Sequence, residues 1–253
     1  MVLASDVLLE ERHGAVLILS MNRPERLHAL NRQLNAAIVG AVERANADPS
    51  VRVIILTGTG DRSFCAGADM REATSTDSAR EPVEEGPRVN ASKAIADSPL
   101  PIIAAVNGFC YGGGARLAIQ ADLRLAADTA TFRIPGAEYG LVVAAATLPR
   151  LVGAAKAKEL LFTTRRIDAA EALACGLVTA VYPQADLIPA ALAMAQTIAG
   201  YSAAAVRDAK RVIDAATLSD DALALEDEVN QRLRGSPEQT ERFRDATRRV
   251  TGH

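Results

Sequence analysis

The chain has 253 residues, 49% of them hydrophobic and 23% charged, which suits one large globular domain with or without an appendage. A net charge of −3, 4% aromatic residues and the lack of Trp argue against nucleic-acid binding through a basic surface or stacked rings. No apolar segment is long enough to span a bilayer, and Met1–Glu11 lacks the features of a signal peptide. Cys65, Cys110 and Cys175 are odd in number and widely spaced, which predicts reduced thiols in a cytoplasmic protein. The three histidines are scattered, so no metal site is predicted.

The N-terminal part predicts two strands followed by a helix. Strands are expected over Val7–Glu10 and Ala15–Ser20, with a turn at His13-Gly14 between them. Asn31 is a favourable N-cap for a helix over Arg32–Ala47, where apolar residues recur at helical spacing. Asp48-Pro49 then ends the helix.

A buried strand and a polar insertion follow. The β-branched run Val51–Thr57 is typical of a parallel strand covered on both faces. The segment Ser63–Met70 contains small residues at which a ligand could approach the backbone. The polar, acidic stretch Arg71–Arg88 predicts a surface loop that grades into a helix near Val89–Asp97.

Three consecutive glycines follow the next buried strand. The apolar run Leu100–Val106 leads into Gly112-Gly113-Gly114, and a helix-like run leaves it. Glycines at a strand-to-helix junction let a ligand approach the backbone and leave N–H groups at the positive end of a helix dipole. Such a site suits an oxygen that becomes negative during a reaction. For three glycines taken alone, a tight turn with close helix packing is the commoner explanation.

The remainder of the chain predicts three more strands, with two helices before the last of them, and then helices alone. The expected strands are Asp122–Ala127, Ala130–Ile134 and Leu177–Tyr182. One helix is expected from Ala154, and Asp168 with Glu171 opens another that ends before Gly176. The helices expected in the tail are Leu187–Ala199, Ala203–Ala216, Asp221–Leu233 and a last one from Ser236 through Arg249.

The order of elements predicts an α/β fold with parallel strands. We expect residues 1–185 to form the core and residues 186–253 a helical appendage. In a parallel sheet the carboxyl ends of the strands share one edge, so Cys65–Asp69 and Gly112–Gly114 can converge there. Two converging N–H groups are the minimal oxyanion hole for a carbonyl.

With these two segments in this order, the chain resembles the enoyl-CoA hydratase/isomerase (crotonase) family. The resemblance runs from Val16 to about Tyr182 and is looser in the tail. The matching residues are Asn22-Arg23-Pro24, Ala29-Leu30-Asn31, Phe64 to Met70, Ala105 to Gly108, Gly112-Gly113-Gly114, Ala121 to Arg124, Phe132, Pro135, Gly140, Ala169 to Ala172 and Gly176-Leu177-Val178.

The resemblance implies a spiral of ββα turns with a C-terminal helical trimerisation region, assembled as a homotrimer or a dimer of trimers. It implies an acyl-CoA ligand whose thioester carbonyl sits between the N–H groups of Ala68 and Gly113, with no separate cofactor. Arg23 and Arg26 could pair with CoA phosphates, or could equally be solvated surface residues. The CoA-binding positions that the resemblance implies are Arg26, Leu27, Ala29, Ala66, Ala68, Asp69 and Met70.

The chain departs from the family pattern at both acid–base positions. Where the resemblance leads one to expect glutamates, this sequence has Arg116 and Gly136. Hydration needs carboxylates to take a proton from water and to deliver one to carbon, which neither residue can do at neutral pH. Glu138 could act as a displaced acid–base group, or could be a structural carboxylate paired with Arg116. Arg116 could instead pair with a carboxylate on the acyl group, as in a dicarboxylic acyl-CoA, or form a structural ion pair with Glu138 or Asp122. Arg133, on a predicted strand, is expected to face outward.

Two versions of the leading function therefore remain. In one, enolate stabilisation supports isomerase- or decarboxylase-like chemistry with standard hydration in doubt. In the other, the protein binds acyl-CoA without turnover, as a carrier or sensor. An NAD-dependent oxidoreductase is a distant alternative, because Gly58-Thr59-Gly60 resembles the start of a dinucleotide-binding motif but Ser63 replaces its third glycine.

Overall fold

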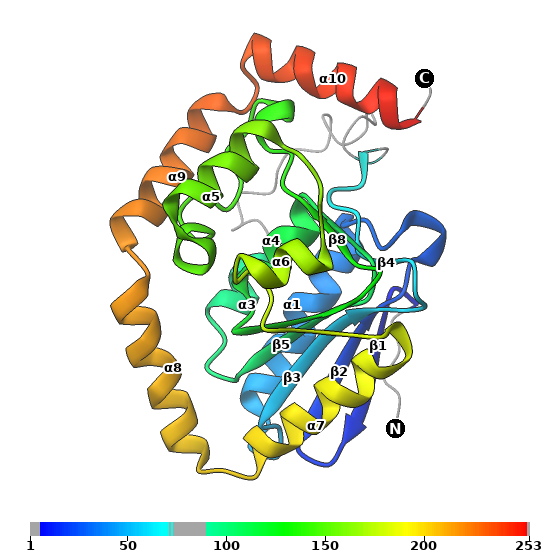
Figure 1. Cartoon of the computed structure of the whole chain (residues 1–253), viewed down its shortest axis with the longest axis vertical. Coiled ribbons are helices and arrows are strands. Elements are labelled where there is room, and N and C mark those ends of the chain that lie inside the picture. The colour runs from blue at the N-terminus through cyan, green and yellow to red at the C-terminus, as the bar shows by residue number, and fades with distance from the viewer. Residues whose placement is uncertain (1–5, 71, 73–89, 252–253) are drawn as a thin grey trace.

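The computed structural model describes residues 6–70, 72 and 90–251 and shows a mixed α/β molecule with two sheets (Figure 1). The larger sheet has the strand order β1-β2-β3-β5-β7-β10, and the smaller has the order β4-β6-β8-β9. The predicted surface loop at 71–88 falls outside the described residues, apart from residue 72.

The six-stranded sheet confirms most of the predicted strands. Only β1 is antiparallel to its neighbour, and the other pairs are parallel. Every residue of β3 and β5 is buried, which explains why their sequences are continuously apolar. The strands are β1 (Leu8–His13), β2 (Val16–Met21), β3 (Val53–Gly58), β5 (Ile102–Val106), β7 (Leu123–Ala127) and β10 (Ala180–Tyr182).

The four-stranded sheet was mostly missed. Its strands are β4 (Ser63–Cys65), β6 (Phe109–Tyr111), β8 (Thr131–Arg133) and β9 (Ile167–Asp168), and only β8 was predicted. The glycine run therefore does not follow β5 directly, because β6 lies between them. Strands of two or three residues carry too little hydrophobic periodicity to be recognised.

Helix ends agree closely with the cap residues. The Asn31 side chain accepts a hydrogen bond from the Leu34 N–H at 2.8 Å, and Asp168 accepts one from the Glu171 N–H at 2.8 Å. Gly153 has φ 76° and ψ 157° inside α5, so the continuous part of that helix starts at Ala154, as predicted. The helices are α1 (Arg32–Ala47), α3 (Ala91–Ala96), α4 (Gly113–Gln120), α5 (Pro149–Thr163), α6 (Ala169–Ala174), α7 (Leu187–Ala199), α8 (Ala203–Thr217), α9 (Asp220–Leu233) and α10 (Pro237–Thr251), with 3-10 turns η1 (Pro24–Arg26), η3 (Ala137–Tyr139) and η4 (Gln184–Asp186).

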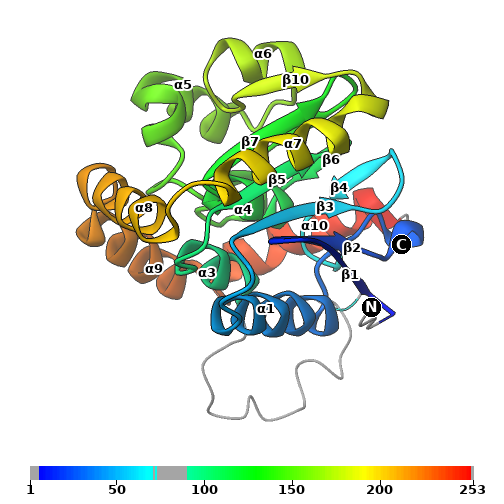
Figure 2. The same ribbon diagram turned by 90° about the horizontal axis from the view of Figure 1, so that it is seen from below.

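The tail does not separate from the core at residue 186. Helix α7 buries Leu187, Ala191 and Ala195 in the main hydrophobic core, and Figure 1 shows it in front of β2 and β3 with α1 behind them. Helices α8 and α9 then run along one edge of the molecule, as Figure 2 also shows, and α10 crosses its end. In the described residues no single helix could span a membrane; η4 and α7 with α8 meet the length and composition criteria only together, across a 106° bend.

Candidate functional site

A buried asparagine joins the ends of two central strands. Asn107 follows β5, and its Oδ1 accepts a hydrogen bond from the Gly58 N–H at 3.2 Å. Its Nδ2 donates to the carbonyl oxygens of Gly58 and Gly60 at 2.9 and 2.7 Å. Asn107 is 2% exposed, so these bonds fix the loops that leave the carboxyl ends of β3 and β5. Strands β4 and β6 continue from those loops and pair in parallel.

The two small-residue segments that follow β4 and β6 lie side by side. A side-chain carbon built on Gly113 would lie 3.7 Å from the Ala68 nitrogen, and one built on Gly67 would lie 3.4 Å from the Gly113 nitrogen. Gly67 and Gly112 have φ values of 105° and 51°, a region that favours glycine. The structure thus brings together the two segments that the sequence pattern singled out.

The amides at Ala68 and Gly113 are available to a ligand. Their neighbours are engaged, since the Ala66, Asp69 and Gly112 N–H groups donate to backbone oxygens at 3.0, 3.0 and 2.9 Å. Within the described part of the chain, the Ala68 and Gly113 N–H groups have no hydrogen-bond acceptor. Ala68 is exposed, and Gly113 opens α4, where the helix dipole favours negative charge. This arrangement can receive a polarised carbonyl oxygen.

The loop before α1 lines this site and is fixed by a buried histidine. The His28 ring accepts a hydrogen bond from the Arg23 N–H at Nδ1 and donates through Nε2 to the Thr59 carbonyl, both at 3.0 Å. Only a neutral ring can do both. Burial lowers the pKa of His28, which keeps the ring neutral.

Arginine and aspartate side chains in the predicted CoA-binding region form an internal ion pair. Arg23 Nη2 lies 2.8 Å from Asp69 Oδ2, with side chains 12% and 11% exposed, and Arg23 also donates to the Ala29 carbonyl. Of the two arginines expected to contact CoA phosphates, Arg26 is exposed and Arg23 is already paired. Leu27, Ala29, Ala66 and Met70 are half-buried.

The two positions at which glutamates were expected flank the amide pair. Gly112 packs against Pro135, since a carbon built on Gly112 would lie 3.9 Å from Pro135 Cδ. The next residue, Gly136, leaves no room for a side chain, because a carbon built there would lie 2.8 Å from the Leu141 oxygen and 3.0 Å from Val143 Cγ2. The chain itself therefore fills the space beside position 136.

Arg116 has a different partner from those predicted. Its Nη2 lies 3.9 Å from Glu226 Oε1, on α9. The predicted pairs of Arg116 with Glu138 or Asp122 are wrong: Glu138 lies 2.5 Å from Arg133 and 3.5 Å from Arg249, and Asp122 is paired with Lys210 at 2.9 Å. Arg133 is consequently turned toward Glu138 and the Thr164 carbonyl.

Two residues of α9 were missed by the sequence analysis. Glu226 accepts hydrogen bonds from the N–H groups of Ala144 and Ala146 at 3.1 and 2.8 Å. Asn230 accepts from the Val142 N–H at 3.0 Å and donates to its carbonyl at 2.7 Å. Both side chains are 6% exposed, so α9 fixes the segment that leads away from Gly136. Their spacing of four residues on a helix was the only available signal.

The loop that resembled a dinucleotide-binding motif does not present free amides. The Gly58 N–H donates to Asn107 and the Thr59 N–H donates to the Met21 carbonyl at 2.9 Å. A strand, β4, follows instead of a helix, so the phosphate-binding helix N-terminus of such motifs is missing at this loop.

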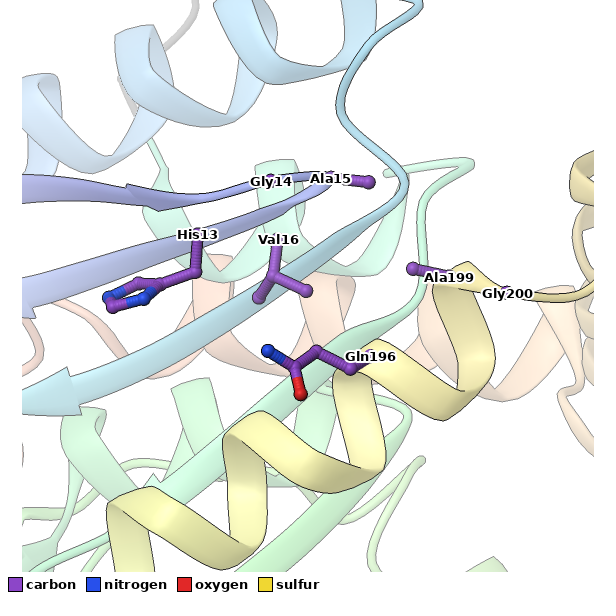
Figure 3. Close-up of a pocket in the computed structure, with 7 residues that line it drawn as sticks. All are labelled: His13, Gly14, Ala15, Val16, Gln196, Ala199 and Gly200. Carbon is purple, nitrogen blue, oxygen red and sulfur yellow. The ribbon is translucent and has the colours of Figure 1, made fainter.

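A shallow hollow of ≈ 500 Å³ lies elsewhere, between the β1–β2 turn and the end of α7 (Figure 3). His13 is its one titratable lining residue, and Val16 places it at the amino ends of the parallel strands. Ligand sites in parallel sheets lie at the carboxyl ends, where Ala68 and Gly113 are.

Comparison with known proteins agrees with this geometry. The sequence model of the enoyl-CoA hydratase/isomerase family matches residues 11–250. The chain belongs to the enoyl-CoA hydratase/isomerase family. Among its relatives is a crotonyl-CoA hydratase of Syntrophomonas wolfei, 38% identical over 213 residues, which cover 82% of this chain and 81% of the relative.

Solved structures of the family share the fold. An enoyl-CoA hydratase/isomerase from Pseudoalteromonas atlantica superimposes with a TM-score of 0.85 at 33% identity, covering 93% of this chain and 94% of that one. A monofunctional enoyl-CoA isomerase from M. smegmatis superimposes with a TM-score of 0.72 at 31% identity, covering 86% and 98%. The chain therefore has the crotonase fold, as the sequence resemblance predicted.

Proposed function

We propose that this protein binds an acyl-CoA thioester with its carbonyl oxygen between the N–H groups of Ala68 and Gly113. The adjacency of these two amides, both without an acceptor in the described residues, is the observation that carries the proposal. Donors fixed in advance stabilise a developing oxyanion or enolate without reorganisation. The half-buried residues Leu27, Ala29, Ala66 and Met70, with exposed Arg26, would hold the CoA moiety beside them.

Hydration is a poor match to the acid–base groups present. Arg116 is cationic and Gly136 has no side chain, while the oxygens of Glu138 face Arg133 and Arg249. Glu138 is therefore engaged in ion pairs with two arginines, which hold its carboxylate away from a role as general acid. The absence of one acid–base group typically costs about 10²–10⁴ in rate. We therefore assign binding with enolate stabilisation, and isomerase- or decarboxylase-like chemistry is the turnover that such a site could support.

A non-catalytic carrier or sensor is the second candidate. It is favoured by the closed space at Gly136, because no side chain can be placed there to replace the missing acid without moving Leu141. Both candidates require the same acyl-CoA complex and differ only in turnover.

Assembly as a homotrimer or a dimer of trimers is part of the proposal. Large apolar side chains are exposed on the outer helices, including Val212 at 64%, Ile213 at 59% and Leu225 at 58%. Exposed apolar side chains on neighbouring outer helices would be covered if these helices packed against another subunit. Light scattering should give three or six times the 26.6 kDa chain mass, and a monomer would contradict this part.

Calorimetric titration with butyryl-CoA and with free CoA, alongside a crotonyl-CoA hydration assay, tests the function. We expect butyryl-CoA to bind more tightly than CoA and hydration to be slow. Equal affinity for CoA and butyryl-CoA, or no binding, would overturn the oxyanion-hole proposal. Rapid hydration would leave binding intact and refute our account of the acid–base positions.

A further inference from the structure

Arg116 occupies the helical turn that follows the Gly113 amide. The two residues are three apart on α4, so they share a face. Side chains on a helix lean toward its N-terminus and cover the preceding turn. The Arg116 side chain therefore leaves α4 from the face and the turn that present the Gly113 N–H, and 26% of it is exposed.

The donors of this guanidinium are not satisfied by the described protein residues. Its Nε is buried and has no hydrogen-bond partner. Its Nη2 is 3.9 Å from Glu226, which is too long for a hydrogen bond. A guanidinium has five N–H donors arranged as a fork that matches a carboxylate.

Arginines with structural roles in this chain are bonded differently. Arg124, which is 5% exposed, donates to the carbonyls of Leu177 and Ala121 at 2.8 and 2.6 Å. Arg133 donates to Thr164 and Glu138 at 2.8 and 2.5 Å. Arg116 has a neutralising charge nearby but no hydrogen-bond acceptor among the described residues.

Glu226 is held in place by backbone donors. Both of its oxygens accept backbone hydrogen bonds, from Ala144 and Ala146, and it is 6% exposed. It is therefore fixed at 3.9 Å, where it balances the charge of Arg116 and leaves the donor fork open.

We infer that Arg116 selects acyl groups that carry a carboxylate, so that the preferred ligand is a short dicarboxylic acyl-CoA. The inference rests on the proposed acyl-CoA function. The thioester oxygen binds at the Gly113 amide and the distal carboxylate binds at the Arg116 guanidinium. Because both residues lie within the first turn of α4, the acyl chain between the two groups is limited to a few carbons. The carboxylate supplies the acceptors that Arg116 lacks.

Succinyl-CoA and butyryl-CoA test this directly, because both acyl groups have four carbons and only one ends in a carboxylate. We expect calorimetry to give the wild type about 10- to 100-fold tighter binding of succinyl-CoA, the range for charge-assisted hydrogen bonds. Arg116→Gln should bring this ratio close to one, while butyryl-CoA should still bind more tightly than free CoA. Arg116→Lys, which keeps the charge but loses the fork, should give an intermediate ratio.

Two further variants separate this role from stability. Glu226→Gln removes the competing anion and should raise the preference for succinyl-CoA, although one backbone N–H loses its acceptor. Arg150→Gln is the matched control, because Arg150 also has a buried Nε without a partner but is paired with Asp214 at 3.0 Å. It should lower the melting temperature without changing the ratio.

Different results would overturn the Arg116 inference and the proposed acyl-CoA function. A wild-type ratio of one or below, with butyryl-CoA still bound, overturns the inference alone and needs no variant. A preference for succinyl-CoA that survives in Arg116→Gln also overturns it. If neither thioester binds more tightly than free CoA, the proposed function fails as well.

Discussion

Replacing Gly136 by alanine is expected to destabilise the protein, although its backbone does not require glycine. Gly136 has φ −52° and ψ −49°, which any residue can adopt. The added carbon would lie 2.8 Å from the Leu141 oxygen, which is a backbone atom and cannot rotate away. Overpacking of this kind costs about 1–3 kcal/mol. For a chain of this length that corresponds to a fall of roughly 2–12 °C in melting temperature.

Gly200 provides the matched control. Its φ of −74° and ψ of −16° are also helical, but the nearest atom to an added carbon is the Thr197 oxygen at 3.4 Å. Gly200→Ala should be neutral or stabilising by about 0.4–1 kcal/mol, because alanine restricts the unfolded chain. Melting should be followed by circular dichroism at one protein concentration, since assembly affects stability. Equal melting temperatures for the two variants would refute the claim that the segment Leu141–Val143 closes position 136.

Three other substitutions test the supports of the site. Asp69→Ala should cost on the order of 3 kcal/mol by leaving the Arg23 charge unpaired, and the double variant Arg23→Met/Asp69→Leu should be less destabilised than Asp69→Ala. Equal losses would mean that the unpaired Arg23 charge is not the source of the destabilisation. Because the pKa of His28 is lowered in the folded protein, its contribution to stability is complete above about pH 6.5 and is lost as the pH falls through its folded pKa. His28→Gln should therefore flatten the dependence of melting temperature on pH between 7 and 5. An unchanged pH profile would contradict this. Asn107→Ala should cost about 1–3 kcal/mol for each buried group left unpaired, measured by urea unfolding, whereas a loss below 1 kcal/mol would show that the loops are fixed by other contacts.

Local signals predicted the fold well where caps and long apolar runs define it. Asn31 caps the start of α1, and the continuously apolar sequence of β3 is typical of a central strand covered on both faces. Strands β4 and β6 were missed because three residues contain little periodicity, and they form by pairing with each other.

The site was predictable only in its backbone. Gly67 and Gly112 have positive φ values, which glycine adopts most readily, so these glycines marked the two paired segments in the sequence. The partner of Arg116 is a residue of α9, and no local pattern links positions so distant in the chain. The closure of position 136 likewise depends on how Leu141 and Val143 fold back onto it.

The position of the thioester carbonyl can be measured by infrared spectroscopy of butyryl-CoA labelled with ¹³C at that carbon. Two N–H donors at Ala68 and Gly113 would polarise the bond, so we predict that its stretching band moves to lower frequency on binding than in water. A band at the frequency of the free thioester, with calorimetry showing the ligand bound, would place the carbonyl outside the two amides and contradict the account.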